Sequence, residues 1–132
     1  MFGNTNMGVL NLAFPDVCEV IAAITLIPTP LINLALSFTH IPSVFQVLLG
    51  CGFAENLLTT GTISNGDEAG LALGVVSILI IGPDRPYTSS IQVMYGTAPA
   101  TRMTTVTGQN GFMPNAPGIS LTPSQVCVLI LG

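Results

Sequence analysis

The side chains in this sequence that could perform acid–base chemistry are few, and they stand far apart. His40 is the only histidine, and Asp67 and Glu68 are the only adjacent pair of carboxylates. Carboxylates that converge on a substrate can act as general acid and base, and a histidine can activate a nucleophile. Neighbours in sequence need not converge, however, and this pair directly follows an Asn-Gly turn signal. The alternative is that both acids cap the turn or pair with Arg85.

Three cysteines and the histidine offer ligand types that zinc accepts. A zinc site built from them would use His40, Cys18, Cys51 and Cys127, which would have to converge from distant positions. The chain has no CxxC or HxxxH spacing, so we predict no cofactor and keep these four residues only as zinc candidates. An odd and low cysteine count also indicates reduced thiols rather than a disulfide scaffold.

Motifs for enzymatic catalysis are absent. The sequence contains no Gly-x-Ser-x-Gly nucleophile elbow and no Gly-Lys-Ser/Thr phosphate loop. We therefore expect a protein that is not an enzyme. A small hydrolase that uses Asp67, Glu68 or His40 is the least favoured alternative.

Charge is scarce and apolar residues are abundant. Arg85 and Arg102 are the only basic residues, against six acidic ones, which gives a net charge of −4. This balance excludes nucleic acid as a partner, because phosphate neutralisation needs several Lys or Arg side chains. Hydrophobic residues make up 49% of the chain, yet 14 glycines and 10 prolines interrupt it. The apolar content requires burial while the breakers forbid long helices, so we predict an all-β single domain over residues 1–132.

The elements that must position these side chains are short apolar runs between turn signals. Asn-Gly at 65–66 and Gly-Pro at 82–83 mark two of the turns. Helix should be minor and lie near residues 43–49 or 55–58, and no strict internal repeat is visible. The runs predicted as strands are 7–14, 17–27 (strand or helix), 31–38, 44–49, 73–81, 90–95, 103–106 and 126–131.

Several loop sequences together resemble a known family. They occur in the order Phe-Pro-Asp-Val-Cys at 14–18, Asn-Gly-Asp-Glu-Ala-Gly at 65–70, Gly-Pro-Asp-Arg at 82–85, Gly-Thr-Ala-Pro-Ala-Thr-Arg-Met-Thr at 96–104, Gly-Gln-Asn-Gly at 108–111 and Thr-Pro-Ser-Gln-Val at 122–126. The ensemble resembles the PAAR-like family of type VI secretion proteins named for a Pro-Ile-Pro-Tyr-Pro-Asn motif. The resemblance covers essentially the whole chain.

The resemblance implies a small β-rich cone that caps the trimeric VgrG spike of a contractile injection machine. It implies a structural protein that can carry a fused or a separate effector, or a chaperone; for this chain we expect no fused effector domain. It would be cytoplasmic before firing and then exported to the extracellular space or a target cell, with transient passage through membranes. Partner contacts are expected at loop residues, namely Asn65, Gly66, Asp67, Glu68, Gly82, Asp84, Arg85, Arg102, Gln109 and Asn110.

The chain also departs from the family pattern. Residues 28–33 read Pro-Thr-Pro-Leu-Ile-Asn, and segments 20–36 and 73–81 are unusually aliphatic. These changes indicate a face that is buried by another chain, by further copies or by lipid. The related PAAR tips hold zinc through three histidines and a cysteine, a set that this chain lacks. The alternative to a spike tip is therefore a self-assembling or membrane-associated hydrophobic β protein.

Overall fold

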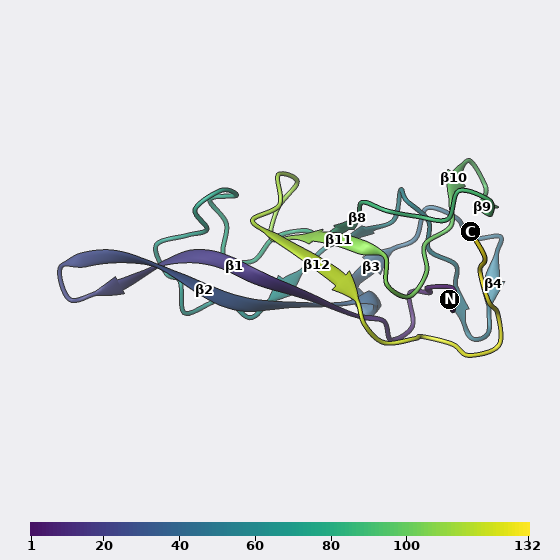
Figure 1. Ribbon diagram of the computed structural model, residues 1–132, viewed down its shortest axis with the longest axis horizontal. Coiled ribbons are helices and arrows are strands. Elements are labelled where there is room, and N and C mark those ends of the chain that lie inside the picture. The colour runs from purple at the N-terminus through teal and green to yellow at the C-terminus, as the bar shows by residue number, and fades with distance from the viewer.

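The structure, a computed structural model, describes residues 1–132 and is almost entirely β (Figure 1). One six-stranded sheet has the order β7-β2-β1-β12-β11-β8. Three two-stranded ribbons pair β3 with β6, β4 with β5, and β9 with β10. The all-β prediction is confirmed. The strands are β1 (Leu10–Ala22), β2 (Thr25–Leu36), β3 (His40–Ile41), β4 (Leu48–Leu49), β5 (Gly52–Phe53), β6 (Thr60–Gly61), β7 (Ser64–Asn65), β8 (Arg85–Pro86), β9 (Met94–Tyr95), β10 (Ala98–Pro99), β11 (Val106–Gln109) and β12 (Ala116–Ser120).

The β1–β2 hairpin is the longest feature, and it projects away from the end that carries both termini (Figure 1). Its antiparallel register runs from Leu10↔Leu36 to Ala22↔Thr25. Strand β12 pairs with β1 only as far as Ala13, so the hairpin leaves the sheet beyond that point. The outer part of β2 is an edge, which is where a strand tolerates prolines that cannot donate a hydrogen bond.

The prediction of two separate elements at 7–14 and 17–27 is wrong in its boundaries. A single strand, β1, runs through Phe14 and Pro15, and the register with β2 shifts between Ala13 and Asp16. A bulge of this kind accommodates extra residues while the pairing continues on both sides. Segment 17–27 therefore contains the end of β1, the hairpin turn and the start of β2. The turn begins at Ala23, whose φ is +56°.

The strand predicted at 73–81 is absent. Gly74 accepts a hydrogen bond from the Ile78 amide and donates one to Leu79, so the segment closes on itself as turns. Leu73 and Ile78 have positive φ angles, which are incompatible with a continuous strand. On its other side the loop is held to β1, because Val75 N donates to Val17 O.

Helix is limited to one turn, η1 (Ser37–Thr39), and neither predicted location is helical. Around residues 55–58 the reason is local. The Oδ1 atom of Asn56 accepts hydrogen bonds from the Leu58 amide and the Ser43 hydroxyl. A side chain that bonds its own backbone in this way competes with helix formation.

The interior is small and mostly polar. The hydrophobic cluster consists of Leu49, Ala54, Tyr95, Ala100 and Ile130, all near the end that carries the termini. Elsewhere asparagines, threonines, serines and aspartates are buried, while many large aliphatic side chains face outward. The aliphatic residues of this chain therefore do not mainly form its own core, and the fold depends on hydrogen bonds between buried polar groups.

Candidate functional site

The end of the molecule opposite the hairpin is built from three similar units. Unit one is residues 45–56 and contains β4 and β5; unit two is residues 91–102 and contains β9 and β10. Unit three is made by both ends of the chain, residues 126–130 and 1–5. The equivalent pairings are Leu48↔Phe53, Met94↔Pro99 and Leu129↔Phe2. Figure 1 shows β4, β9, β10 and both termini together at this end.

A closed ring of backbone hydrogen bonds joins the three units. Glu55 N donates to Asn4 O at 3.1 Å, Asn4 N donates to Thr101 O at 3.1 Å, and Thr101 N donates to Glu55 O at 3.0 Å. Each unit therefore donates once and accepts once, and all three residues are buried. Within the units the same bond recurs, from Ala54 to Val47, from Ala100 to Val93 and from Gly3 to Val128. The three-unit end thus has an approximate threefold axis.

Equivalent positions of the units also fill the hydrophobic cluster. Leu49, Tyr95 and Ile130 occupy the same place in their units, as do Ala54 and Ala100. The counterpart of these alanines is Gly3, where an added Cβ would lie 2.8 Å from Cδ1 of Ile130. The hydrophobic cluster at this end therefore receives one large side chain from each unit, namely Leu49, Tyr95 and Ile130.

The outer surface of this end repeats three times as well. Each unit exposes two apolar side chains that are three positions apart, and the six residues form what we call the apolar triads. Exposed fractions are nearly equal in the inner triad: 62% for Leu48, 58% for Met94 and 60% for Leu129. The outer triad is Phe45, Ile91 and Val126.

Sequence reasoning missed this repeat. The only sequence feature that the three units share is a valine two residues before the core residue Leu49, Tyr95 or Ile130. These valines are Val47, Val93 and Val128. The third unit is divided between the two ends of the chain, so a search for consecutive repeats cannot find it. The hydrogen-bond ring that joins the three units uses only backbone atoms, and backbone bonds place little constraint on side-chain identity.

The predicted partner residues divide into two groups. Asn65, Gly66 and Glu68 are exposed, Arg85 and Arg102 are partly buried, and Gly82 is buried. By contrast, the side chains of Asp67, Asp84, Gln109 and Asn110 lie inside the fold. Loops 65–70, 82–85 and 108–110 meet one another, whereas Arg102 belongs to the three-unit end, where it pairs with Gly3. The buried side chains join loops internally and are not available to a partner in this conformation.

His40 lies between two buried carboxylates. Its Nδ1 is 2.7 Å from Oε1 of Glu55, and its Nε2 is 3.2 Å from Oδ2 of Asp84. Burial alone would lower the pKa of His40, but the contacts with Asp84 and Glu55 outweigh it and raise that pKa to about 10. The histidine is therefore a cation at neutral pH, and it links unit one to strand β3 and to the loop that carries Asp84.

We expect the stability of the protein to fall as the pH rises through the alkaline range. His40 binds its proton more tightly when folded, so its contribution is fully present below its ordinary pKa of 6.5 and is lost as pH approaches about 10. Urea unfolding midpoints measured between pH 6 and pH 10 should decrease steadily. The variant His40→Gln shares every other titrating group, including Cys18, whose raised pKa lowers stability only from about pH 8.5 upward. Its midpoint should therefore be nearly flat between pH 6 and pH 8, where the wild-type midpoint falls; parallel profiles in that range would contradict this assignment.

A second buried polar cluster lies where the hairpin leaves the body. The Cys18 thiol is 3.5 Å from Oδ1 of Asp16 and 3.3 Å from Oδ2 of Asp67. Burial, and then the contacts with Asp67 and Asp16, raise the pKa of Cys18. Burial and the charge of Asp16 likewise raise the pKa of Asp67 to about 6, although its bond to the Cys18 thiol opposes the shift.

The four residues considered as zinc ligands from the sequence do not come together. Cys18 is in the cluster just described, and His40 is held by Glu55 and Asp84. Cys51 and Cys127 are exposed at the three-unit end, and all three cysteines are free thiols. Neither exposed cysteine shares a site with the other candidates.

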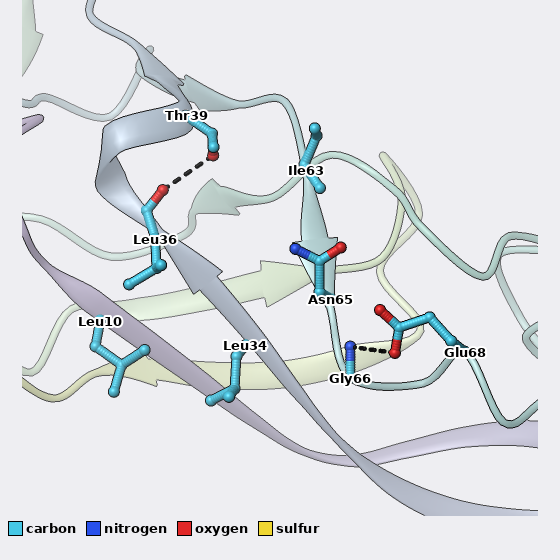
Figure 2. A pocket seen from close by; sticks show the side chains of 8 residues that line it. All are labelled: Leu10, Leu34, Leu36, Thr39, Ile63, Asn65, Gly66 and Glu68. Carbon is cyan, nitrogen blue, oxygen red and sulfur yellow. Dashed lines mark hydrogen bonds between the residues drawn. The ribbon is translucent and has the colours of Figure 1, made fainter.

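The most pronounced surface hollow lies beside β2 and β7 (Figure 2). Its one ionisable side chain is Glu68, whose Oε2 accepts a hydrogen bond from the Gly66 amide at 3.0 Å. The paired acid Asp67 is buried elsewhere, so the adjacent carboxylates do not face a common space. The lining residues are Leu10, Leu34, Leu36, Thr39, Ile63, Asn65, Gly66 and Glu68.

Comparisons with known proteins identify the family. No curated protein and no solved structure matched the chain. None of the helical structure is long and apolar enough to cross a membrane. A family model described as the toxin PAAR-like domain matches residues 9–118. That range includes β1 to β12 almost completely, together with units one and two. The chain belongs to the Tox-PAAR-like family, and it is therefore a PAAR-type protein of the kind associated with type VI secretion.

Proposed function

We propose that this protein caps the VgrG trimer of a type VI secretion spike, with its three-unit end seated on the trimer. The observation that supports this most is the ring through Asn4, Glu55 and Thr101. A partner with a threefold axis presents three copies of one surface, and a single chain can meet all three only if it offers three similar surfaces. The three-unit end offers them.

The apolar triads supply the contact chemistry. Six exposed aliphatic, Met or Phe side chains in two threefold sets form a neutral surface that a partner would remove from water. Full burial of such a side chain contributes about 1.5–3 kcal/mol.

The β1–β2 hairpin then forms the leading point of the spike. Its turn carries Ile24, which is 98% exposed, and Glu19 is the only charged residue between Cys18 and the end of β2. A narrow apolar point with little charge is suited to passing through a bilayer, where charged side chains are costly. In this role the protein is structural and not an enzyme, and it leaves the cell with the spike and any separate effector.

The test is co-purification with the cognate VgrG, followed by native mass determination. We expect one copy of this chain per VgrG trimer, because one chain contains all three units. A chain that ignores VgrG and forms its own oligomer would refute the cap and favour the self-assembling alternative, for which the exposed aliphatic residues of the hairpin are the supporting observation.

A further inference from the structure

Three potential metal ligands converge at the base of the hairpin. Asp16 and Cys18 lie on β1, directly after its bulge, and Asp67 lies in the loop after β7. All three residues are 0% exposed, and their ligand atoms lie within 4.8 Å of one another. Residues from two separate segments therefore direct two carboxylates and a sulfur to one point.

The spacing of these atoms suits a tetrahedral metal. A zinc ion with bonds of about 2.3 Å to sulfur and about 2.0 Å to oxygen separates those ligands by about 3.5 Å. The sulfur of Cys18 lies 3.5 Å from Oδ1 of Asp16 and 3.3 Å from Oδ2 of Asp67. The bulge in β1 contributes to this arrangement, since it sets where Asp16 lies relative to Cys18.

The cluster has more acceptors than donors, and it lacks a cation. The fully buried Oδ1 atoms of Asp67 and of the adjacent Asn33 have no hydrogen-bond partner. Asn33 contacts the cluster through its Nδ2, which donates to Oδ2 of Asp16 at 2.8 Å, so the unpartnered oxygen within the cluster is Oδ1 of Asp67. The only ion pairs of the chain are those of His40, so no basic side chain balances these acids. Buried carboxylates without a counter-charge are costly, and a bound cation removes that cost.

We propose that Asp16, Cys18 and Asp67 bind one zinc ion through two carboxylates and a thiolate. The amide nitrogen of Asn115 lies against Oδ1 of Asp16 and 3.8 Å from the Cys18 sulfur. The orientation of this amide is fixed, because its Oδ1 accepts a hydrogen bond from the Val76 amide and its Nδ2 donates to Val17 O, so Asn115 supports Asp16 as a donor and is not itself a ligand. A thiolate ligand selects zinc over magnesium or calcium, which prefer oxygen alone. On binding, the thiol releases its proton to solvent, and the net ligand charge of −3 is reduced to −1.

This site differs from the zinc set considered from the sequence, with which it shares only Cys18. It is also independent of docking to VgrG, since its ligands lie where the hairpin leaves the body, whereas the apolar triads lie at the end opposite the hairpin. Its effect would be structural. A zinc ion here would tie the projecting hairpin to the loop that carries Asp67, in addition to the backbone bonds at Val17 and Glu19 and the side-chain bonds from Asn110 and Asn115.

The test uses the full chain, refolded with one equivalent of Co²⁺ or Zn²⁺. We expect one bound metal per chain by elemental analysis after dialysis, and a sulfur-to-cobalt charge-transfer band in the near ultraviolet. Cys18→Ser should remove that band and weaken zinc binding about 100-fold or more, given that loss of outer-sphere partners alone costs 10–100-fold. Cys51→Ser and Cys127→Ser are matched controls, since their exposed thiols lie outside the site.

Failure of the wild-type chain to retain cobalt or show the charge-transfer band would overturn the proposal. It would also fail if Cys51→Ser or Cys127→Ser abolished the band while Cys18→Ser kept it. Should Cys18→Ser not fold, Asp67→Asn replaces a ligand with a side chain of the same shape. That variant should keep the sulfur band but bind zinc more weakly, and unchanged affinity would exclude Asp67 as a ligand.

Discussion

Simultaneous replacement of Leu48, Met94 and Leu129 by lysine is expected to abolish binding to the VgrG trimer. These side chains are exposed in the isolated chain, so the change should leave folding nearly intact. At a docked interface, each lysine replaces an apolar contact with a charge that must be desolvated. A loss of about 1.4 kcal/mol per position corresponds to a tenfold weaker affinity, so the triple variant should bind about 10³-fold more weakly or worse.

The pseudo-equivalence of the units makes a sharper form of this prediction. The three single variants should weaken binding by similar factors, because each residue meets an equivalent surface of a threefold partner. Affinity can be measured by interferometry on immobilised VgrG, with circular dichroism as a check on folding. The matched control places lysine at Ile21, Ile24 and Leu26, exposed aliphatic residues of the hairpin turn.

The control triple should bind VgrG normally. If the hairpin lysines abolish binding while the triad lysines do not, the molecule docks by its opposite end. If the hairpin lysines instead dissolve a homo-oligomer that forms without VgrG, the self-assembling alternative is correct. Each result therefore shows which apolar surface, the triads or the hairpin, contacts VgrG or further copies of this chain.

The class of the fold could be predicted from the sequence, because glycine and proline exclude long helices and the apolar runs are short. The order of loop motifs also indicated the family that the match to residues 9–118 shows. The element boundaries were less predictable. Segment 73–81 has the composition of a buried strand, yet it contacts β1 only around Val17 and Glu19, and positive φ angles at Leu73 and Ile78 close its backbone into turns.

The candidate site was not predictable in the same way. The three-unit end depends on backbone bonds among Asn4, Glu55 and Thr101, three residues of unrelated type. Asp67, Asp84 and Asn110 were predicted as partner contacts because they lie in the loop motifs that resemble the family, and loops usually lie on the surface. In the structure these side chains are buried. The fold has few large apolar residues inside, and hydrogen bonds between buried polar side chains join its loops instead. Polarity alone therefore does not distinguish a docking loop from a buried network.

Replacement of His40 by leucine is expected to be the most destabilising single change in the chain. It leaves Glu55 and Asp84 buried without their shared cation. Removal of one partner from a buried charged pair typically costs about 3–5 kcal/mol, which for a domain of this size is a large part of the total stability. The effect should also reach the three-unit end, because Glu55 contributes both backbone bonds of unit one to the ring. Urea unfolding followed by circular dichroism measures the loss.

Most of this loss should come from the unpaired charges of Glu55 and Asp84, and less from the lost packing of the imidazole ring. A compensating variant distinguishes these two contributions. Glu55→Gln and Asp84→Asn remove both negative charges while keeping side chains of similar size, so adding them to His40→Leu should restore part of the stability. The same two changes made with His40 present should destabilise the protein, because the pKa of the buried histidine would then fall and its cation would be lost. If the compensating variant is less stable than His40→Leu alone, then packing against His40 and not its charge holds β3 to unit one.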